Sequence, residues 1–142
     1  MNWRAITPLV DGDEIEEFEN SINYQFPKSF KEFIPLHNGG KPSHKVFKTK
    51  TSREKVFNNL LSFNKNDLDN IWEINDWNAS MSDWNKDGSM NNYVAFAQDA
   101  FGNLICFDKT NDHIVFIDHE TLSIEPVADS FSEFIAGLKK IK

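Results

Sequence analysis

The sequence contains little cysteine and no long apolar run. Cys106 is the single cysteine among 142 residues, so an internal disulfide is excluded and a reducing compartment is the expected setting. A membrane-spanning helix needs about 18 consecutive apolar residues, and runs such as Ile114–Ile117 suffice only for a strand. Residues 1–5 also lack the basic and apolar segments of a secretory signal. We therefore expect a cytoplasmic protein that does not span a membrane.

Recognisable catalytic signatures are also missing. His37, His44, His113 and His119 form no local pattern with a nucleophile, and no cysteine or closely spaced histidine completes a zinc set. Gly39-Gly40-Lys41 follows a predicted helix, whereas a phosphate-binding P-loop follows a strand. Cys106 lies in an apolar segment that predicts a buried strand, where it acts as a small hydrophobe. We expect no enzyme activity, no cofactor and no metal.

One calcium-binding motif is incomplete. Asp83-Trp84-Asn85-Lys86-Asp87-Gly88 matches the first six positions of an EF-hand loop. Position 12, which supplies a bidentate glutamate in that motif, is Val94, and the strand pattern needs this residue. A turn rich in Asn, Asp and Gly is the simpler interpretation, with a calcium-dependent activity as the alternative.

Aromatic residues and acids are abundant. Thirteen Phe and four Trp predict a core filled largely by rings, and a chain of this length can bury one such core. The net charge is −7, which disfavours direct binding of nucleic acid and favours basic partners. We expect a single domain over residues 1–142.

Two helices are predicted near the N-terminus. The first begins near Asp11 or Asp13, since Asp11 with Glu14 and Asp13 with Glu16 have capping-box spacing. Its apolar positions recur at helical spacing, and they are Ile15, Phe18 and Ile22. The second helix opens at Pro27, and its apolar stripe is Phe30, Phe33 and Ile34. Gly39-Gly40 ends it.

Strands dominate the remainder of the chain. The basic stretch from Lys41 to Lys55 predicts a loop or an exposed hairpin, and residues 75–92 predict an ordered surface loop. The predicted strands are separated in the C-terminal half by short turns, and they are Val56–Phe63, Tyr93–Gln98, Leu104–Phe107, Ile114–Asp118 and Ser123–Val127. Pro126 places the last strand at an edge. We expect an antiparallel meander.

Two further helices are predicted. Asp67 is expected to cap a short helix that carries Leu68, Ile71 and Trp72. The last helix begins with the capping box of Ser130 and Glu133 and should pack on the sheet. Its apolar stripe is Phe131, Phe134, Ile135 and Leu138. Helices at both ends of an antiparallel sheet predict an α+β domain.

The acids gather in two clusters. Residues 11–19 contain six acids and no base, and residues 67–87 contain five aspartates and Glu73 against Lys86 alone. For either cluster alone, a solvated surface is the simpler interpretation. The second cluster also contains tryptophans, and aromatic residues framed by acids are typical of an interface that anchors and steers a basic partner. The candidate partner-binding residues are Asp67, Asp69, Asp76, Trp77, Asp83, Trp84 and Asp87.

A series of short segments carries a family resemblance along nearly the whole chain. In order, they are Ile15–Ile22, Phe26–Phe33, Asn38-Gly39-Gly40, Val94–Asp99, Gly102-Asn103, Phe107-Asp108 and Val127–Phe134. Together they resemble the SUKH superfamily, which includes bacterial immunity proteins and the yeast cell-wall synthesis regulator Knr4/Smi1. The middle of the chain, residues 41–92, matches poorly, and Val94-Ala95 stands where the family often has proline. Most matching residues are caps, turns and core aromatics.

The resemblance implies a function as well as an α+β fold. Bacterial members of the superfamily often bind and block a toxin, frequently a nuclease. An acidic protein fits this role because nucleases present basic surface to phosphates. We expect an immunity protein that binds a cognate toxin with a basic surface in the cytoplasm. The alternative is a housekeeping scaffold or regulatory module of the same fold without a toxin partner. The oligomeric state stays open.

Overall fold

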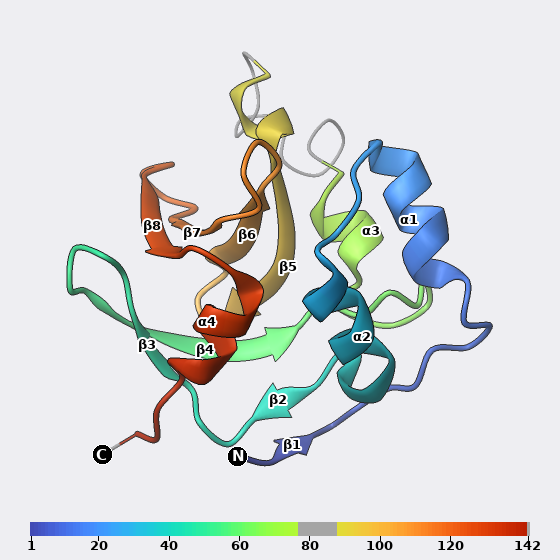
Figure 1. The fold of residues 1–142 in the computed structure, drawn as a ribbon, viewed down its shortest axis with the longest axis horizontal. Coiled ribbons are helices and arrows are strands. Elements are labelled where there is room, and N and C mark those ends of the chain that lie inside the picture. The colour runs from blue at the N-terminus through green and yellow to red at the C-terminus, as the bar shows by residue number, and fades with distance from the viewer. Residues whose placement is uncertain (77–87, 142) are drawn as a thin grey trace.

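The computed structural model describes residues 1–76 and 88–141 and has the predicted α+β architecture (Figure 1). In this part of the chain the elements are, in order, β1 (Trp3–Arg4), α1 (Glu14–Ile22), α2 (Lys28–His37), β2 (Lys41–Pro42), β3 (Val46–Lys48), β4 (Glu54–Leu60), α3 (Ile71–Ile74), the 3-10 turn η1 (Ser89–Asn92), β5 (Tyr93–Asp99), β6 (Leu104–Asp108), β7 (Ile114–Ile117), β8 (Ile124–Ala128) and α4 (Phe131–Ala136). None of the helices described is long and apolar enough to cross a bilayer.

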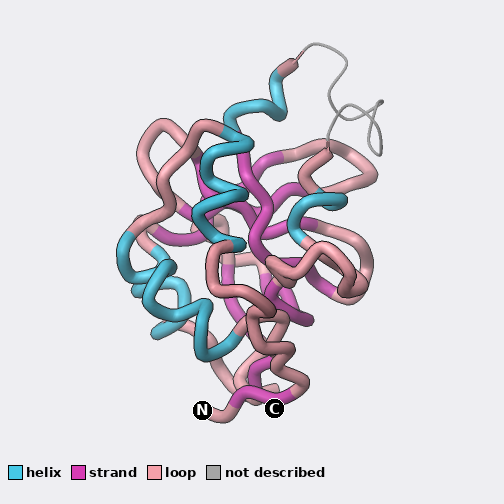
Figure 2. The backbone as a smooth tube through the Cα atoms, turned by 90° about the vertical axis from the view of Figure 1, so that its right-hand side faces the viewer, coloured by secondary structure: helices cyan, strands magenta, loops and turns pink. Residues whose placement is uncertain are grey.

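The main sheet is the predicted antiparallel meander. Its strand order is β3-β4-β5-β6-β7-β8, so each strand pairs with its neighbours in sequence. Most of the basic stretch lies in the β3–β4 hairpin, in agreement with the predicted loop or hairpin. β8, which contains Pro126, is an edge strand, as predicted, and Pro126 lies opposite Val115. A separate pair, β1 with β2, lies at the lower end of the molecule beside the N-terminus (Figure 2).

The two edges of the sheet approach each other. The backbone N–H of Lys50, at the tip of the β3–β4 hairpin, donates to the carbonyl of Pro126 at 2.8 Å. Lys50 also forms an ion pair with Asp129, and Glu125 of β8 pairs with Arg53 at 3.4 Å. The sheet is therefore curled, with charged pairs between the hairpin tip and β8.

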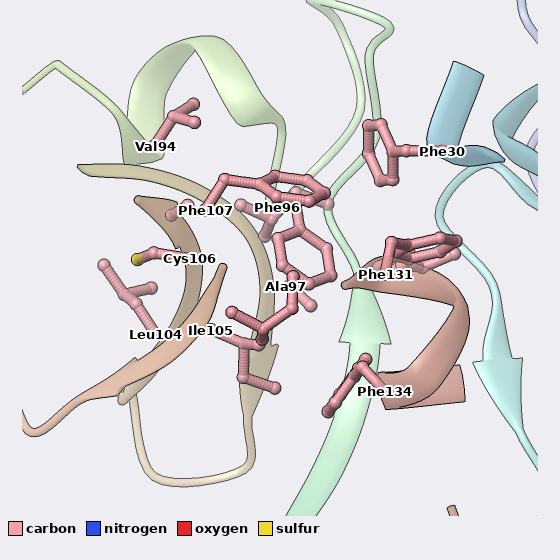
Figure 3. Packing of buried hydrophobic residues seen from close by; sticks show 14 of the residues in the cluster. Phe30, Val94, Phe96, Ala97, Leu104, Ile105, Cys106, Phe107, Phe131 and Phe134 are labelled. Carbon is pink, nitrogen blue, oxygen red and sulfur yellow. The ribbon is translucent and has the colours of Figure 1, made fainter. Parts of the chain in front are cut away.

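The core consists mainly of phenylalanines, as predicted from the composition. α2 and α4 pack on the sheet through rings that are almost fully buried, and five of them are Phe30, Phe96, Phe107, Phe131 and Phe134 (Figure 3). Phe96 and Phe107 lie 4.6 Å apart between centroids, and Phe30 meets Phe131 edge to face at 5.0 Å. Each buried ring contributes about 1.5–3 kcal/mol through apolar burial.

Cys106 is fully buried in β6, as predicted. Burial raises the pKa of its thiol well above the ordinary value, because the charged thiolate is disfavoured there. Cys106 therefore has the small-hydrophobe role expected of it.

The helix starts confirm one prediction and correct another. Asp13 is the N-cap residue of α1, as predicted, although its side chain makes no capping bond; Glu14 Oε2 accepts the N–H of Asp11 at 2.9 Å, which is the glutamate half of the predicted Asp11–Glu14 capping box. The predicted cap by Asp67 is wrong, because α3 begins only at Ile71 and the capping atom is Asn70 Oδ1, which accepts the N–H of Glu73. Leu68 consequently lies outside the helix.

Other boundaries agree more closely with the sequence. Ser130 Oγ accepts the N–H of Glu133 at 3.1 Å, as the capping box predicts, and Gly39 has a φ of +72° just after α2. β4 ends at Leu60, three residues before the predicted strand end at Phe63. The predicted surface loop over 75–92 falls largely outside the described residues.

Candidate binding face

The described part of the second acidic cluster, residues 67–76, includes the end of the loop between β4 and α3, and α3 itself. α3 packs against α1 through Trp72, whose ring meets Phe18 edge to face at 5.1 Å. Trp72 Nε1 also donates to the carbonyl of Phe63 at 3.0 Å. α1 and α3 are thus neighbours, and we call α1 together with residues 61–76 the acidic side (Figure 1). Its exposed carboxylates include Glu16, Glu17 and Glu73.

Asp67 is part of the internal framework of this side. Its Oδ2 accepts hydrogen bonds from Ser62 Oγ at 2.7 Å and from Asn64 Nδ2 at 3.1 Å. The bond from Ser62 is the main cause that lowers the pKa of Asp67, and the bond from Asn64 adds to it against the opposing effect of burial. The ionised carboxylate therefore shapes the loop between β4 and α3.

A buried asparagine anchors the same loop to the rest of the fold. Asn38 Oδ1 accepts the N–H of Phe63 at 2.9 Å, and Asn38 Nδ2 donates to the carbonyl of Thr7 and to Ser62 Oγ. The end of α2, the N-terminal segment and the loop thus share one side chain. The next residue, Gly39, has no room for a Cβ, which would lie 2.7 Å from Thr7 Oγ1.

This framework presents two apolar side chains to solvent. Leu68 is 93% exposed and stands between Asp67 and Asp69. Val10 is 76% exposed, and its N–H donates to Asn64 Oδ1 at 3.1 Å, so both segments contact the same asparagine. An apolar side chain flanked by acids on a hydrogen-bonded loop is a suitable anchor for a basic partner. The sequence did not single out Leu68, because its spacing with Ile71 and Trp72 predicted a helix face.

Asp69 and Asp76 are both exposed, at opposite ends of α3. Asp69 has a positive φ of 54°, and its carbonyl accepts the N–H of Ser62. Asp76 follows Asn75, whose side chain fixes the end of α3 to β5: Ala95 N–H donates to Asn75 Oδ1 at 2.7 Å, and Asn75 Nδ2 donates to the carbonyl of Ala95.

Beside Asp76 lies a small pocket of about 250 Å³ between α1, η1 and β5. Lys109 lines this pocket and donates to the carbonyl of Ile22 at 3.4 Å. Burial lowers the pKa of Lys109. Lys109, a partly buried cation, and Asp76, the last described residue of the acidic cluster before residue 77, therefore line the same pocket.

The structure thus divides the predicted site residues into three groups. Asp69 and Asp76 lie on the surface of the acidic side, while Asp67 is held inside its loop. The remaining candidates lie outside the described residues, and they are Trp77, Asp83, Trp84 and Asp87. No group of three or more metal-ligating side chains is placed to hold an ion within residues 1–76 and 88–141.

Known proteins resemble this chain over most of its length. Residues 9–137 match the SMI1 / KNR4 family (SUKH-1), a range that extends from just before α1 to just after α4. The chain belongs to the SUKH-1 family. It is also 27% identical over 140 residues to the SPbeta prophage-derived uncharacterized protein YokK of Bacillus subtilis (strain 168). That alignment covers 89% of this chain and 73% of YokK.

SUKH-1 membership confirms the resemblance predicted from the sequence. The segments that carry it have structural roles in this chain. Besides Asn38 and Gly39, Asn103 belongs to the β5–β6 turn, where Asp99 Oδ1 accepts its N–H at 2.9 Å and Asp99 Oδ2 accepts its Nδ2 at 2.8 Å. Family membership therefore accounts for the fold.

Proposed function

We propose that this SUKH-1 protein is an immunity protein that binds a toxin domain with a basic surface and blocks it, without catalysis or a cofactor of its own. The toxin class that fits best is a nuclease, and the place of action is the cytoplasm. The observation that carries the proposal is Leu68, an almost fully exposed apolar side chain between two aspartates on a loop fixed from within.

Charge supports this choice of partner. The chain has a net charge of −7, and its exposed acids Glu16, Glu17 and Glu73 belong to the neighbouring helices α1 and α3. A nuclease must present cationic surface to phosphates, so the acidic side would attract it at long range and compete with its substrate. The same net charge disfavours direct contact with nucleic acid.

The hydrogen bonds of the loop between β4 and α3 support Leu68 as the anchor residue. Hydrogen bonds from Ser62 and Asn64 to Asp67, and from Phe63 to Asn38, hold the segment that carries Leu68. A side chain presented by a preformed loop loses less conformational entropy on binding than one presented by a flexible segment. We propose Asp69 and Asp76 as contact residues in addition to Leu68, together with Trp77, Asp83, Trp84 and Asp87, and Asp67 as the residue that positions the loop.

The test is complex formation with toxin domains encoded beside this gene. Purified full-length protein is mixed with catalytically inactivated toxin domains, and a stoichiometric complex is expected by isothermal titration calorimetry. Co-expression should also protect bacteria from the active toxin. If none of these domains binds, the immunity proposal fails and the scaffold or regulatory alternative takes its place.

A pair of leucine variants then locates the contact. Leu68→Ala should weaken the complex about tenfold, which is the effect of removing one apolar anchor from the centre of an interface. Leu36→Ala is the matched control, because Leu36 is a 70% exposed leucine on α2, outside the acidic side. Equal affinities of the two variants would contradict the placement of the anchor.

A further inference from the structure

The β3–β4 hairpin turns two kinds of side chain to its two faces. Val46 pairs with Val56, Phe47 with Lys55, and Lys48 with Glu54. The ring of Phe47 packs into the core, 5.3 Å from Phe134. Because side chains alternate along a strand, Val46, Val56, Lys48 and Glu54 share the opposite, outer face.

The segment after α4 makes this face a groove. Val46 and Lys139 exchange two backbone hydrogen bonds of 2.8 Å, so the chain beyond α4 runs along the outer edge of β3. The groove has a volume of about 610 Å³. Its apolar lining is open to solvent, since Val56 is 38% and Ile141 is 60% exposed. We call it the basic groove.

The charges of the basic groove are mostly positive. Lys48, Lys139 and Lys140 line it, and Glu54 is its acid. Other cations of the hairpin already have acidic partners: Lys50 pairs with Asp129, and Arg53 pairs with Glu125. Within the described chain, the three lysines of the groove have no ion pair, so their charge is available to a ligand.

The backbone of Lys48 adds a hydrogen-bonding position. The carbonyl of Lys45 accepts the N–H of Phe57, and the N–H of Thr49 donates to the carbonyl of Arg53. Lys45 and Thr49 therefore direct their backbone groups toward β4. The alternation of an antiparallel ladder then directs the N–H and C=O of Lys48 away from β4. Val46 and Lys50 use the same edge to bond Lys139 and Pro126, and in the described residues Lys48 has no backbone partner there.

We propose that the basic groove binds an extended peptide segment in which acidic side chains alternate with apolar ones. Such a segment can pair with the backbone of Lys48, direct its carboxylates to the groove lysines and place its apolar side chains on Val46, Val56 and Ile141. A basic protein is repelled by these lysines. This ligand is therefore chemically distinct from the basic partner proposed for the acidic side, and the two proposals stand or fall separately.

The test is a titration of the isotope-labelled full chain with a capped octapeptide of alternating Glu and Val, followed by two-dimensional amide NMR. We expect saturable shifts at Val46–Lys48, Val56 and residues 139–141. The peptide with Lys in place of Glu should produce no shifts. Absence of shifts with the acidic peptide, or shifts confined to other regions, would overturn the proposal.

Matched variants test the charge argument. Lys48→Glu/Lys140→Glu should weaken the acidic peptide at least about tenfold, whereas Lys28→Glu/Lys65→Glu, with the same charge change at exposed sites outside the groove, should not. Preserved amide dispersion shows that both variants fold. Equal weakening by the two pairs would contradict a specific site. Concentration-dependent shifts of the groove amides without peptide would show that a second copy fills it, which also overturns the proposal.

Discussion

The acidic side and the β3–β4 hairpin use charge in different ways. In the hairpin, Lys50 and Arg53 pair with acids on or next to β8 and so join the two edges of the curled sheet. On the acidic side, Glu16, Glu17 and Glu73 are exposed and form no ion pair within the described residues. Charges of the first kind contribute to the closure of the fold, and charges of the second kind remain available to a partner.

The two regions also differ in what stabilises them. The hairpin is fixed by aromatic packing, since Phe47 contacts both Phe134 and Phe116. The acidic side depends on buried polar groups, with Asn38 at their centre. Each region should therefore respond to a different kind of substitution.

Removal of the central asparagine should have the largest effect. Asn38→Ala leaves the buried N–H of Phe63 and the partly buried carbonyl of Thr7 without their partner, so the free energy of unfolding should fall by about 3 kcal/mol. Asn66→Ala, at an exposed position of the same loop, should change it by less than about 0.5 kcal/mol. Urea denaturation measures both. A loss below about 1 kcal/mol for Asn38→Ala would show that the loop is fixed by packing instead.

Acid pH should affect the loop through Asp67. Its pKa is lowered in the folded state by the hydrogen bond from Ser62, and then by that from Asn64. Ionised Asp67 therefore stabilises the fold above the unfolded-state pKa of about 3.9, and this stabilisation is lost as the pH falls through the folded-state pKa. Asp67→Asn should reduce the fall in stability below about pH 4, measured by thermal unfolding between neutral and acid pH. Asp69→Asn is the control in the same loop, and identical pH profiles of the two variants would contradict this role.

The ion pairs of the hairpin should have the smallest effect on stability. Glu125→Gln removes the acid that pairs with Arg53 at 3.4 Å and with Lys55 at 3.9 Å. Because Arg53 is largely exposed, the expected loss in the free energy of unfolding is under about 1 kcal/mol. A loss above about 2 kcal/mol in denaturant titration would mean that these pairs dominate the closure of the sheet.

Local signals predicted much of the fold. The capping box of Ser130 with Glu133 and the apolar stripe that follows lie within one short segment, so α4 could be placed from sequence. Most of the meander could be predicted for the same reason, since the turns between β5 and β8 are short and each of these strands pairs with the next.

The acidic side could be predicted only in outline. Asn38 binds groups of Thr7, Ser62 and Phe63, which lie 24 to 31 residues away, and no sequence period marks such a residue. The sequence predicts Asp67 as a helix cap. In the structure its carboxylate accepts hydrogen bonds from Ser62 and Asn64, and the residue that caps α3 is Asn70. The exposure of Leu68 follows from that later helix start.

The acidic side, and not the basic groove, is the face proposed to bind the toxin. The most direct test is the association rate with the cognate toxin domain at low and high salt, measured by stopped flow. Asp69→Lys/Asp76→Lys should slow association at least about tenfold at low salt and flatten its salt dependence, while Lys48→Glu/Lys140→Glu should not slow it. Slower association with the second pair, or unchanged association with the first, would contradict binding of the toxin by the acidic side.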